Sequence, residues 1–221
     1  MPPSLPQRVA QVFVAPASLF RELRERPVWL GALILVVLVG IGVAATTPPE
    51  VFLDRMRDPT DRLGRPVPVT SGPEAIVRWG RILQAFSAAA MLPVVAFAAA
   101  GMLTLLFKVI LRGSATYRQY LAVTAHVLLI PAVGALLLRV WSLLSGGGRT
   151  ALSLATFAPG IDPGGWLYGW LDGLNLFTLW AVGIAAVGVG VLESRRSATG
   201  AAVQLYALLL ALVGWIVLLT H

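Results

Sequence analysis

The sequence predicts an all-α membrane protein, namely a polytopic bundle of five transmembrane helices preceded by an N-terminal amphipathic interfacial helix. Of the 221 residues, 57% are hydrophobic and 12% are charged, whereas an ordinary soluble domain carries roughly 25% charged residues. The apolar residues form long blocks that short arginine-bearing stretches separate. A helix of about 20 apolar residues crosses a bilayer, while a membrane strand needs only about ten alternating ones. Continuous blocks therefore favour helices.

Residues 1–27 are too polar to cross the bilayer, and we expect them to form a cytoplasmic amphipathic segment. Their apolar residues fall on one helical face in two pieces, before and after Pro16. Charged residues between Arg21 and Arg26 occupy the rest of the second piece. Proline suits the first turn of a helix, so Pro16 is expected to begin that piece. Such a segment lies in the headgroup layer before the first span; the alternative is a mobile tail.

Five apolar blocks define a membrane domain over residues 28–221. The expected spans are residues 28–46, 82–107, 119–138, 174–192 and 201–219. Pro93 in the second span and Pro131 in the third each remove a helical hydrogen bond, so both are expected to kink their helices. A short helix is also expected near residues 49–57, where Thr47 begins a capping-box pattern.

The net charge of +7 would point to nucleic acid in a soluble protein, but these arginines stand at the ends of apolar blocks. There they set topology and meet phospholipid headgroups, so we expect membrane lipids and no nucleic acid as partners. The basic residues divide almost evenly between the two sides, and the shorter connectors favour a cytoplasmic N-terminus. Lys108 is the only lysine among 17 basic residues. This bias is typical of GC-rich bacterial genomes and indicates a bacterial cytoplasmic (inner) membrane.

Four stretches of the chain follow one another in an order that is typical of one protein family. Pro16 and residues 20–27 lead into the first span, and residues 113–120 precede a helix that is broken at Pro131. Residues 171–180 introduce the fourth span, and a small polar hinge precedes the last one. Together, in this order and spacing, the stretches resemble bacterial-type members of the Yip1 domain family.

This resemblance implies a five-span helical protein with a cytoplasmic N-terminus. Eukaryotic members of the family resemble membrane-embedded partners of Rab-type GTPases and are not catalysts. The Asp-Leu-Tyr-Gly-Pro signature of those members is absent from this sequence, so GTPase binding is not carried over. For a bacterial-type member, the resemblance implies a fold without a settled activity.

Polar residues inside the spans are candidates for function. A polar group in hydrocarbon costs free energy, so it either forms hydrogen bonds within the protein or has a functional role. His126 lies about two turns into the third span. It is either a proton-responsive or ligand-contacting residue in a crevice, or a neutral imidazole bonded to another helix. Arg139, near the end of the same helix, is expected to extend its guanidinium to the headgroups. Gln84 is expected to make an interhelical hydrogen bond.

A second cluster precedes and enters the fourth span. Asp172 and Asn175 stand just before it, where either could cap the helix. With Phe177 and Trp180 they also form the most family-like group of residues. A structural and a functional role both remain open for this cluster.

The sequence offers no pattern for catalysis, a cofactor or a metal ion. It contains no cysteine, and it lacks the zinc, nucleophile-elbow and phosphate-loop motifs. We therefore expect a non-catalytic protein that organises the membrane or binds a membrane-protein partner, including a second copy of itself. The alternative is a lipid or small-molecule transport component with a pathway near the kinked second and third spans; a membrane enzyme is the third hypothesis. A hydrated crevice at His126 would favour transport, and a dry, close-packed core would favour the adaptor.

Overall fold

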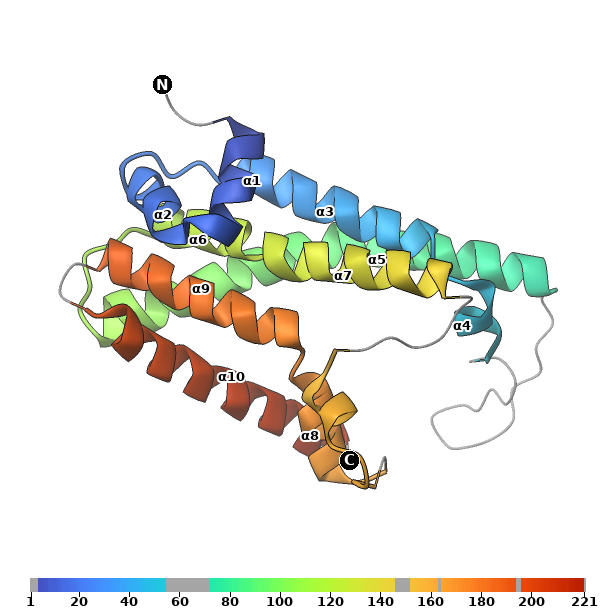
Figure 1. Ribbon diagram of the computed structural model, residues 1–221. Coiled ribbons are helices and arrows are strands. Elements are labelled where there is room, and N and C mark those ends of the chain that lie inside the picture. Colours follow the sequence, from blue (N-terminus) through green and yellow to red (C-terminus); the bar gives the residue numbers. More distant parts are fainter. Residues whose placement is uncertain (1–3, 55–71, 146–151, 163, 194–195, 221) are drawn as a thin grey trace.

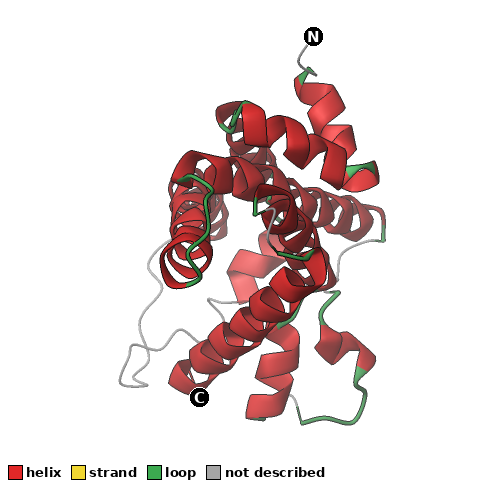
Figure 2. Cartoon of the chain, turned by 90° about the vertical axis from the view of Figure 1, so that its left-hand side faces the viewer, coloured by secondary structure: helices red, strands yellow, loops and turns green. Residues whose placement is uncertain are grey.

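The computed structural model describes residues 4–54, 72–145, 152–162, 164–193 and 196–220, and within these ranges the chain forms helices and no β-strand. Three helical stretches are long and apolar enough to cross a membrane, namely Pro73–Ile110, Tyr117–Leu144 and Ala198–Leu219. Two shorter apolar helices, Leu30–Ala45 and Leu176–Leu192, coincide with the other two expected spans. The five form an elongated bundle with the N-terminal helices laid across one part of it (Figure 1, Figure 2). The all-helical prediction is confirmed, with three helices of membrane-spanning length.

The N-terminal segment forms two helices, α1 (Leu5–Val14) and α2 (Pro16–Glu25), and Pro16 is the first residue of α2 as expected. Its apolar face is covered by protein. Leu19, Phe20 and Leu23 are at most 1% exposed, and α2 packs on α9 and α6. In Figure 1, α2 lies over α9 and α6 in a part of the bundle that α3 does not reach. The apolar side chains that the sequence assigned to the headgroup layer therefore pack inside the bundle, because α3 does not reach this part of it.

The longest helix pairs with the first apolar helix. The elements of this part are α3 (Leu30–Ala45), α4 (Pro49–Asp54), α5 (Pro73–Leu103) and the π-helix η1 (Thr104–Ile110). Ala96 and Ala100 of α5 are 0% exposed and belong to the core of the bundle. A Cβ on Gly40 would come within 2.6 Å of Leu92. α5 continues through Pro93 and passes directly into η1. The short helix expected after the first span is present as α4.

The third span is divided into α6 (Tyr117–Val127) and α7 (Leu129–Leu144). The helix is interrupted at Leu128, one turn before Pro131, because proline has no N–H to donate to the carbonyl of Val127. The break expected from this proline is confirmed. Every residue of α6 from Tyr120 to Val127 is buried, so this helix lies at the centre of the bundle.

The last part of the chain turns back along the bundle. Its elements are the 3-10 helix η2 (Leu154–Phe157), α8 (Trp166–Gly173), α9 (Leu176–Leu192) and α10 (Ala198–Thr220). An antiparallel bridge joins Ser153, the residue before η2, to Asn175, the residue before α9. α10 packs along α9 and touches α8, where the indole of Trp170 donates to the carbonyl of Leu210 at 3.3 Å.

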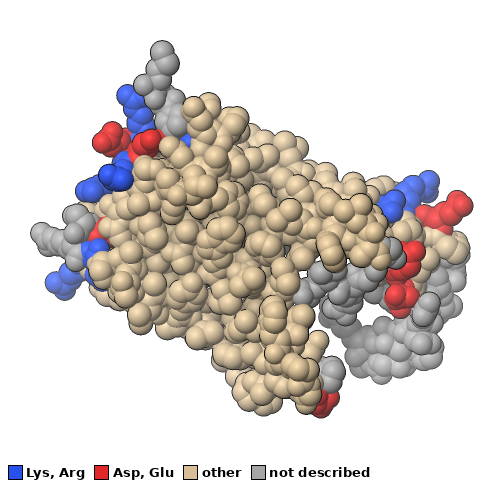
Figure 3. All heavy atoms as spheres, viewed as in Figure 1, with Lys and Arg blue, Asp and Glu red and all other residues tan. Residues whose placement is uncertain are grey.

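The surface of the bundle is apolar along its length and charged at its two ends. Figure 3 shows a broad band without charged side chains between a group near α1 and α2 and a group near the start of α5. Large apolar side chains of the long helices are exposed, such as Phe86 at 71%, Trp141 at 61% and Trp215 at 62% exposure. Contiguous exposed apolar surface on this scale is typical of contact with lipid.

Candidate functional site

Glu193 stands at the end of α9, is 4% exposed and joins segments from three parts of the chain. Its Oε1 accepts hydrogen bonds from the Tyr120 hydroxyl at 2.7 Å and from the backbone N–H of Ala115 at 3.0 Å. Its Oε2 accepts from the backbone N–H of Ser114 at 2.8 Å. Both carboxylate oxygens therefore have donors, and α9 is tied to α6 and to the loop that precedes it.

These donors keep the Glu193 carboxyl ionised. Burial raises the pKa of this carboxyl because the charged form loses water, but the hydrogen bonds from Tyr120, Ala115 and Ser114 stabilise the charged form. The bonds prevail, and the pKa of Glu193 lies below its ordinary value. A carboxylate whose oxygens are already engaged by donors is poorly placed to bind a cation or remove a proton. Its chemistry is that of a structural anion.

The loop that supplies the donors has a constrained shape. Arg112 has a φ of 54°, a left-handed conformation that costs a non-glycine residue roughly 1–2 kcal/mol. Gly113 donates its N–H to the carbonyl of Phe107 at 2.8 Å and so closes the end of η1. A Cβ on Gly113 would collide with Oε1 of Glu193 and with the Phe107 carbonyl. A glycine is therefore required for the carboxylate to approach the loop.

Two arginines extend the connections around this carboxylate. Arg196, in the turn before α10, donates through Nη2 to the carbonyl of Leu111 at 2.8 Å. Arg24 of α2 donates to the carbonyl of Val191 at 3.3 Å, and its own carbonyl accepts from the side chain of Gln119 at 2.7 Å. Side-chain bonds thus join α2, α6, α9 and the loop after η1 at one end of the bundle.

His126 lies in the centre of the bundle and is 0% exposed. Its Nδ1 is 2.8 Å from the carbonyl oxygen of Ala122, four residues earlier in α6. Because a carbonyl oxygen can only accept, Nδ1 carries the hydrogen. The bond is to its own helix and not to another one, which corrects that part of the structural expectation. Nε2 has no hydrogen-bond partner, and the ring has no exposed surface, so the arrangement is not that of a residue lining an open crevice.

Arg139 extends from α7 toward Thr47, which follows α3 and is 1% exposed. Its Nη2 donates to the Thr47 hydroxyl oxygen at 3.3 Å, so the guanidinium has a protein partner at this end of the bundle. The same hydroxyl lies 3.1 Å from the carbonyl of Val43 and 3.0 Å from Oε1 of Gln84. Gln84 of α5 therefore bonds to the connection after α3 and not to a residue within another helix. The Thr47 hydroxyl serves these contacts and not the predicted capping box.

Asn175 and Asp172 lie at the same junction but have different partners. Asn175 is the N-cap of α9, and its Oδ1 accepts from the backbone N–H of Phe177 at 2.8 Å. Asp172 belongs to α8, is exposed, and accepts through Oδ1 from the hydroxyl of Ser153 at 2.8 Å. Asp172 therefore binds the segment before η2 and does not cap α9.

Trp180 lies farther along α9 and contacts the N-terminal segment. Its ring packs edge-on against Phe13 of α1, with centroids 5.6 Å apart. The indole is 42% exposed. The structure therefore separates Trp180 from the Asp172–Asn175 junction and gives it a part in docking α1.

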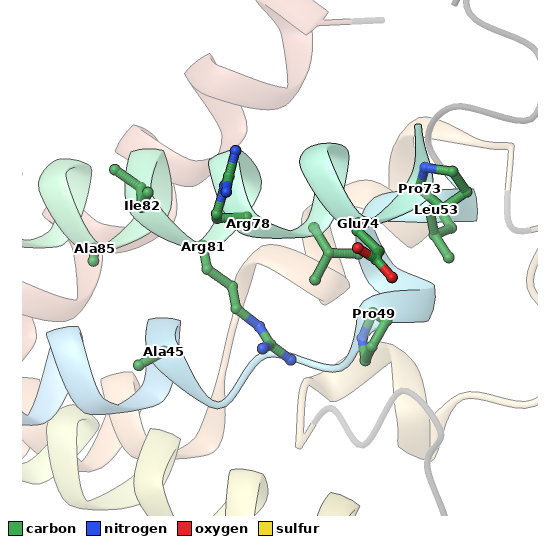
Figure 4. A pocket seen from close by; sticks show the side chains of 10 residues that line it. Ala45, Pro49, Leu53, Pro73, Glu74, Arg78, Arg81, Ile82 and Ala85 are labelled. Atoms are coloured by element: carbon green, nitrogen blue, oxygen red, sulfur yellow. The ribbon is translucent and has the colours of Figure 1, made fainter. Parts of the chain in front are cut away.

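A groove borders the start of α5 near the Thr47 contacts. Its volume is about 660 Å³, and its walls come from the end of α3, from α4 and from the first turns of α5. Apolar side chains such as Leu53 and Ile82 form most of the lining, and Glu74, Arg78 and Arg81 supply the charges. Figure 4 shows Arg81 directed toward the connection between α3 and α4, while Arg78 points away from it.

The comparison with known protein families matches residues 10–218 to the Yip1 domain. The chain belongs to the Yip1 domain family. Neither the curated proteins nor the solved structures contain a significant match to it. The resemblance seen in the sequence is confirmed over nearly the whole chain, and with the apolar helices it makes this a Yip1-family membrane protein.

The Yip1 domain family is not a known enzyme family. Within the described residues, no three histidine or acidic side chains gather as a metal ion requires. The buried acidic and histidine side chains of that part of the chain are Glu193 and His126. Both are engaged by internal hydrogen bonds.

Sequence reasoning missed the two residues on which the ends of this Yip1 domain depend. Glu193 belongs to the small polar hinge before the last span, and no pattern in the sequence indicates that its carboxylate is buried. The sequence predicts Thr47 as a helix cap. Its partners Arg81 and Arg139 lie 34 and 92 positions away, and no local pattern indicates contacts at that separation.

Proposed function

We propose that this Yip1-family protein is a non-catalytic adaptor that crosses a bacterial inner membrane five times, with its N-terminus in the cytoplasm. In this topology α3 and α9 are the first and fourth spans, and the three longer helices are the others. The helix directions support it, because the start of α6, the end of α9 and the start of α10 meet at one end of the bundle (Figure 1). The exposed apolar band between the charged ends supports the same placement.

The observation that carries the adaptor role is the state of two buried ionisable side chains, His126 and Glu193. His126 is 0% exposed and bonded within its own helix, and Glu193 is saturated by backbone and hydroxyl donors. Neither faces a hydrated path, which a transport pathway through the kinked helices would need. The close packing around His126 therefore favours the adaptor over the transport component.

The partner surface that fits this role is the exposed polar face of α2. Arg21, Glu25 and Arg26 are exposed there, while the apolar face of the same helix is fixed on α9 and α6. Arg118, at the start of α6, is exposed at the same end. A rigidly held charged face of this kind suits recognition of a protein partner by charge complementarity.

Crosslinking in native membranes tests the proposal. The intact protein and the double variant Arg21→Glu/Arg26→Glu are crosslinked and purified, and co-purifying proteins and lipids are both quantified. The matched control is Arg78→Glu, an exposed arginine at the other end of the bundle. We expect one stoichiometric protein partner that the control retains and the double variant loses. Recovery of no such partner, together with one tightly held lipid, would contradict the adaptor role and favour lipid handling.

A further inference from the structure

Two arginines from different helices converge on one buried threonine at the end of α3. Arg81 of α5 donates through Nε and Nη2 to the backbone carbonyl of Thr47, at 3.0 and 2.8 Å. Arg139 of α7 donates to the hydroxyl of the same residue at 3.3 Å. Two guanidinium groups, one from α5 and one from α7, thus contact Thr47 at the end of α3.

Among the described residues, the hydrogen bonds of both guanidinium groups go to neutral oxygens of Thr47. The lining of the neighbouring groove contributes one acid, Glu74, together with the two arginines Arg78 and Arg81. The Nε of Arg139 is buried and has no hydrogen-bond partner at all. Both arginines are partly buried, and partial burial of a charged group costs free energy unless its charge and its donors are satisfied. The described part of this site therefore offers positive charge and donors without an anionic partner.

The surroundings decide which kind of anion fits. The groove beside Arg81 has a mostly apolar lining, and neighbouring side chains such as Leu83 and Val140 face outward at 62% and 46% exposure. A small hydrated anion gains nothing from such surfaces. A phospholipid places its phosphate beside its acyl chains, so one molecule satisfies both the arginines and the apolar wall.

We propose that Arg81 and Arg139 form a binding site for the phosphate of an anionic phospholipid, whose acyl chain packs along the adjoining apolar surface. Arginine is suited to this task because its planar guanidinium donates two parallel hydrogen bonds to phosphate oxygens. The site goes beyond the adaptor role, since it lies at the opposite end of the bundle from the α2 face. The lipid site is expected to bind its phospholipid whether or not the α2 face holds a protein partner.

Native mass spectrometry of the full-length protein in detergent measures this binding. The probes are phosphatidylglycerol, phosphatidylcholine and inorganic phosphate, each titrated separately. We expect phosphatidylglycerol to bind at least tenfold more tightly than phosphatidylcholine. We also expect Arg81→Gln/Arg139→Gln to weaken phosphatidylglycerol binding at least tenfold. The control Arg118→Gln, which changes an exposed arginine at the opposite end of the bundle, leaves the binding unchanged.

Equal phosphatidylglycerol binding by the double variant and the native protein would overturn the site. Inorganic phosphate that displaces phosphatidylglycerol at equal concentration would overturn the assignment to a lipid. If the Arg81→Gln/Arg139→Gln variant does not fold, Arg81→Lys/Arg139→Lys replaces it in the test. The lysines keep both charges but lack the paired donors of a guanidinium, so we expect the same tenfold loss of phosphatidylglycerol binding. An unchanged affinity in that variant would also contradict the proposal. None of these readouts depends on the crosslinking test of the adaptor role.

Discussion

The hydroxyl of Tyr120 donates a 2.7 Å hydrogen bond to Oε1 of Glu193, which lies 73 positions later in the chain. This bond connects the central helix α6 to the end of α9. Glu193 also receives the backbone donors of Ser114 and Ala115. One carboxylate therefore sets the spacing of two helices and of the loop between η1 and α6.

Removing this hydroxyl should destabilise the fold. Because the acceptor is charged, we expect Tyr120→Phe to lower the free energy of unfolding by roughly 1.5–3 kcal/mol. The matched control is Tyr206→Phe, which deletes a hydroxyl that donates to the neutral carbonyl of Leu179 at 2.9 Å and should cost only about 1 kcal/mol. Thermal unfolding in detergent measures both. Equal losses in the two variants would contradict a special role for the charged acceptor.

The loop before α6 should respond in opposite directions to two neighbouring substitutions. Gly113→Ala places a Cβ against Glu193 and Phe107 and should cost roughly 1–3 kcal/mol. Arg112→Gly relieves the left-handed backbone and should stabilise the protein by up to about 1 kcal/mol. Gly42→Ala is the control, because its Cβ meets nothing within 4 Å. A neutral Gly113→Ala would show that the loop can move away from the carboxylate.

Stability should depend on pH through Glu193. Its pKa is lowered in the folded protein, so its contribution is complete above the unfolded value of about 4.3 and is lost as pH falls through the folded pKa. The measurement is the difference in unfolding free energy between the native protein and Glu193→Gln, followed from pH 7 to pH 3. We expect this difference to shrink on acidification. A difference that is constant across the range would refute the ionised state.

His126 should tolerate an apolar replacement of similar size. Its Nε2 is buried without a partner, and such a group costs roughly 1–3 kcal/mol. We therefore expect His126→Leu to match or exceed the native stability, whereas His126→Ala leaves a cavity and should lose roughly 2–4 kcal/mol. Partner recovery in the crosslinking experiment should remain intact in both. Loss of the partner in a stable His126→Leu protein would give this histidine a functional role.

The proposed topology is directly testable because the native sequence contains no cysteine. Single cysteines at Arg118 and Ser197 should resist a membrane-impermeant maleimide in intact cells, since both exposed positions would face the cytoplasm. Cysteines at Glu74 and Gly164, exposed at the other end, should be labelled. All four should react after the membrane is permeabilised, which controls for accessibility. The reverse pattern would invert the protein in the membrane.

The candidate residues show how far sequence reasoning reached. Asn175 stands next to the helix that it caps, so a local rule predicts its role. For His126, the depth in the bundle follows from the sequence, but the partner does not. For Arg139, the sequence predicts a position near the headgroups, whereas its contact with Thr47, 92 positions away, follows only from the tertiary structure.

The sequence by itself determined the helices, because hydrophobic transfer and helical hydrogen bonding act on residues close together in the chain. The apolar blocks, Pro16 at the start of α2 and the break before Pro131 all follow from local rules. Only the tertiary structure decided that the apolar face of α2 packs on α9 and that Tyr120 meets Glu193. The convergence of Arg81 and Arg139 on Thr47 was likewise decided only by the tertiary structure. Such contacts depend on which helices lie side by side, and short-range periodicity carries no information about that choice.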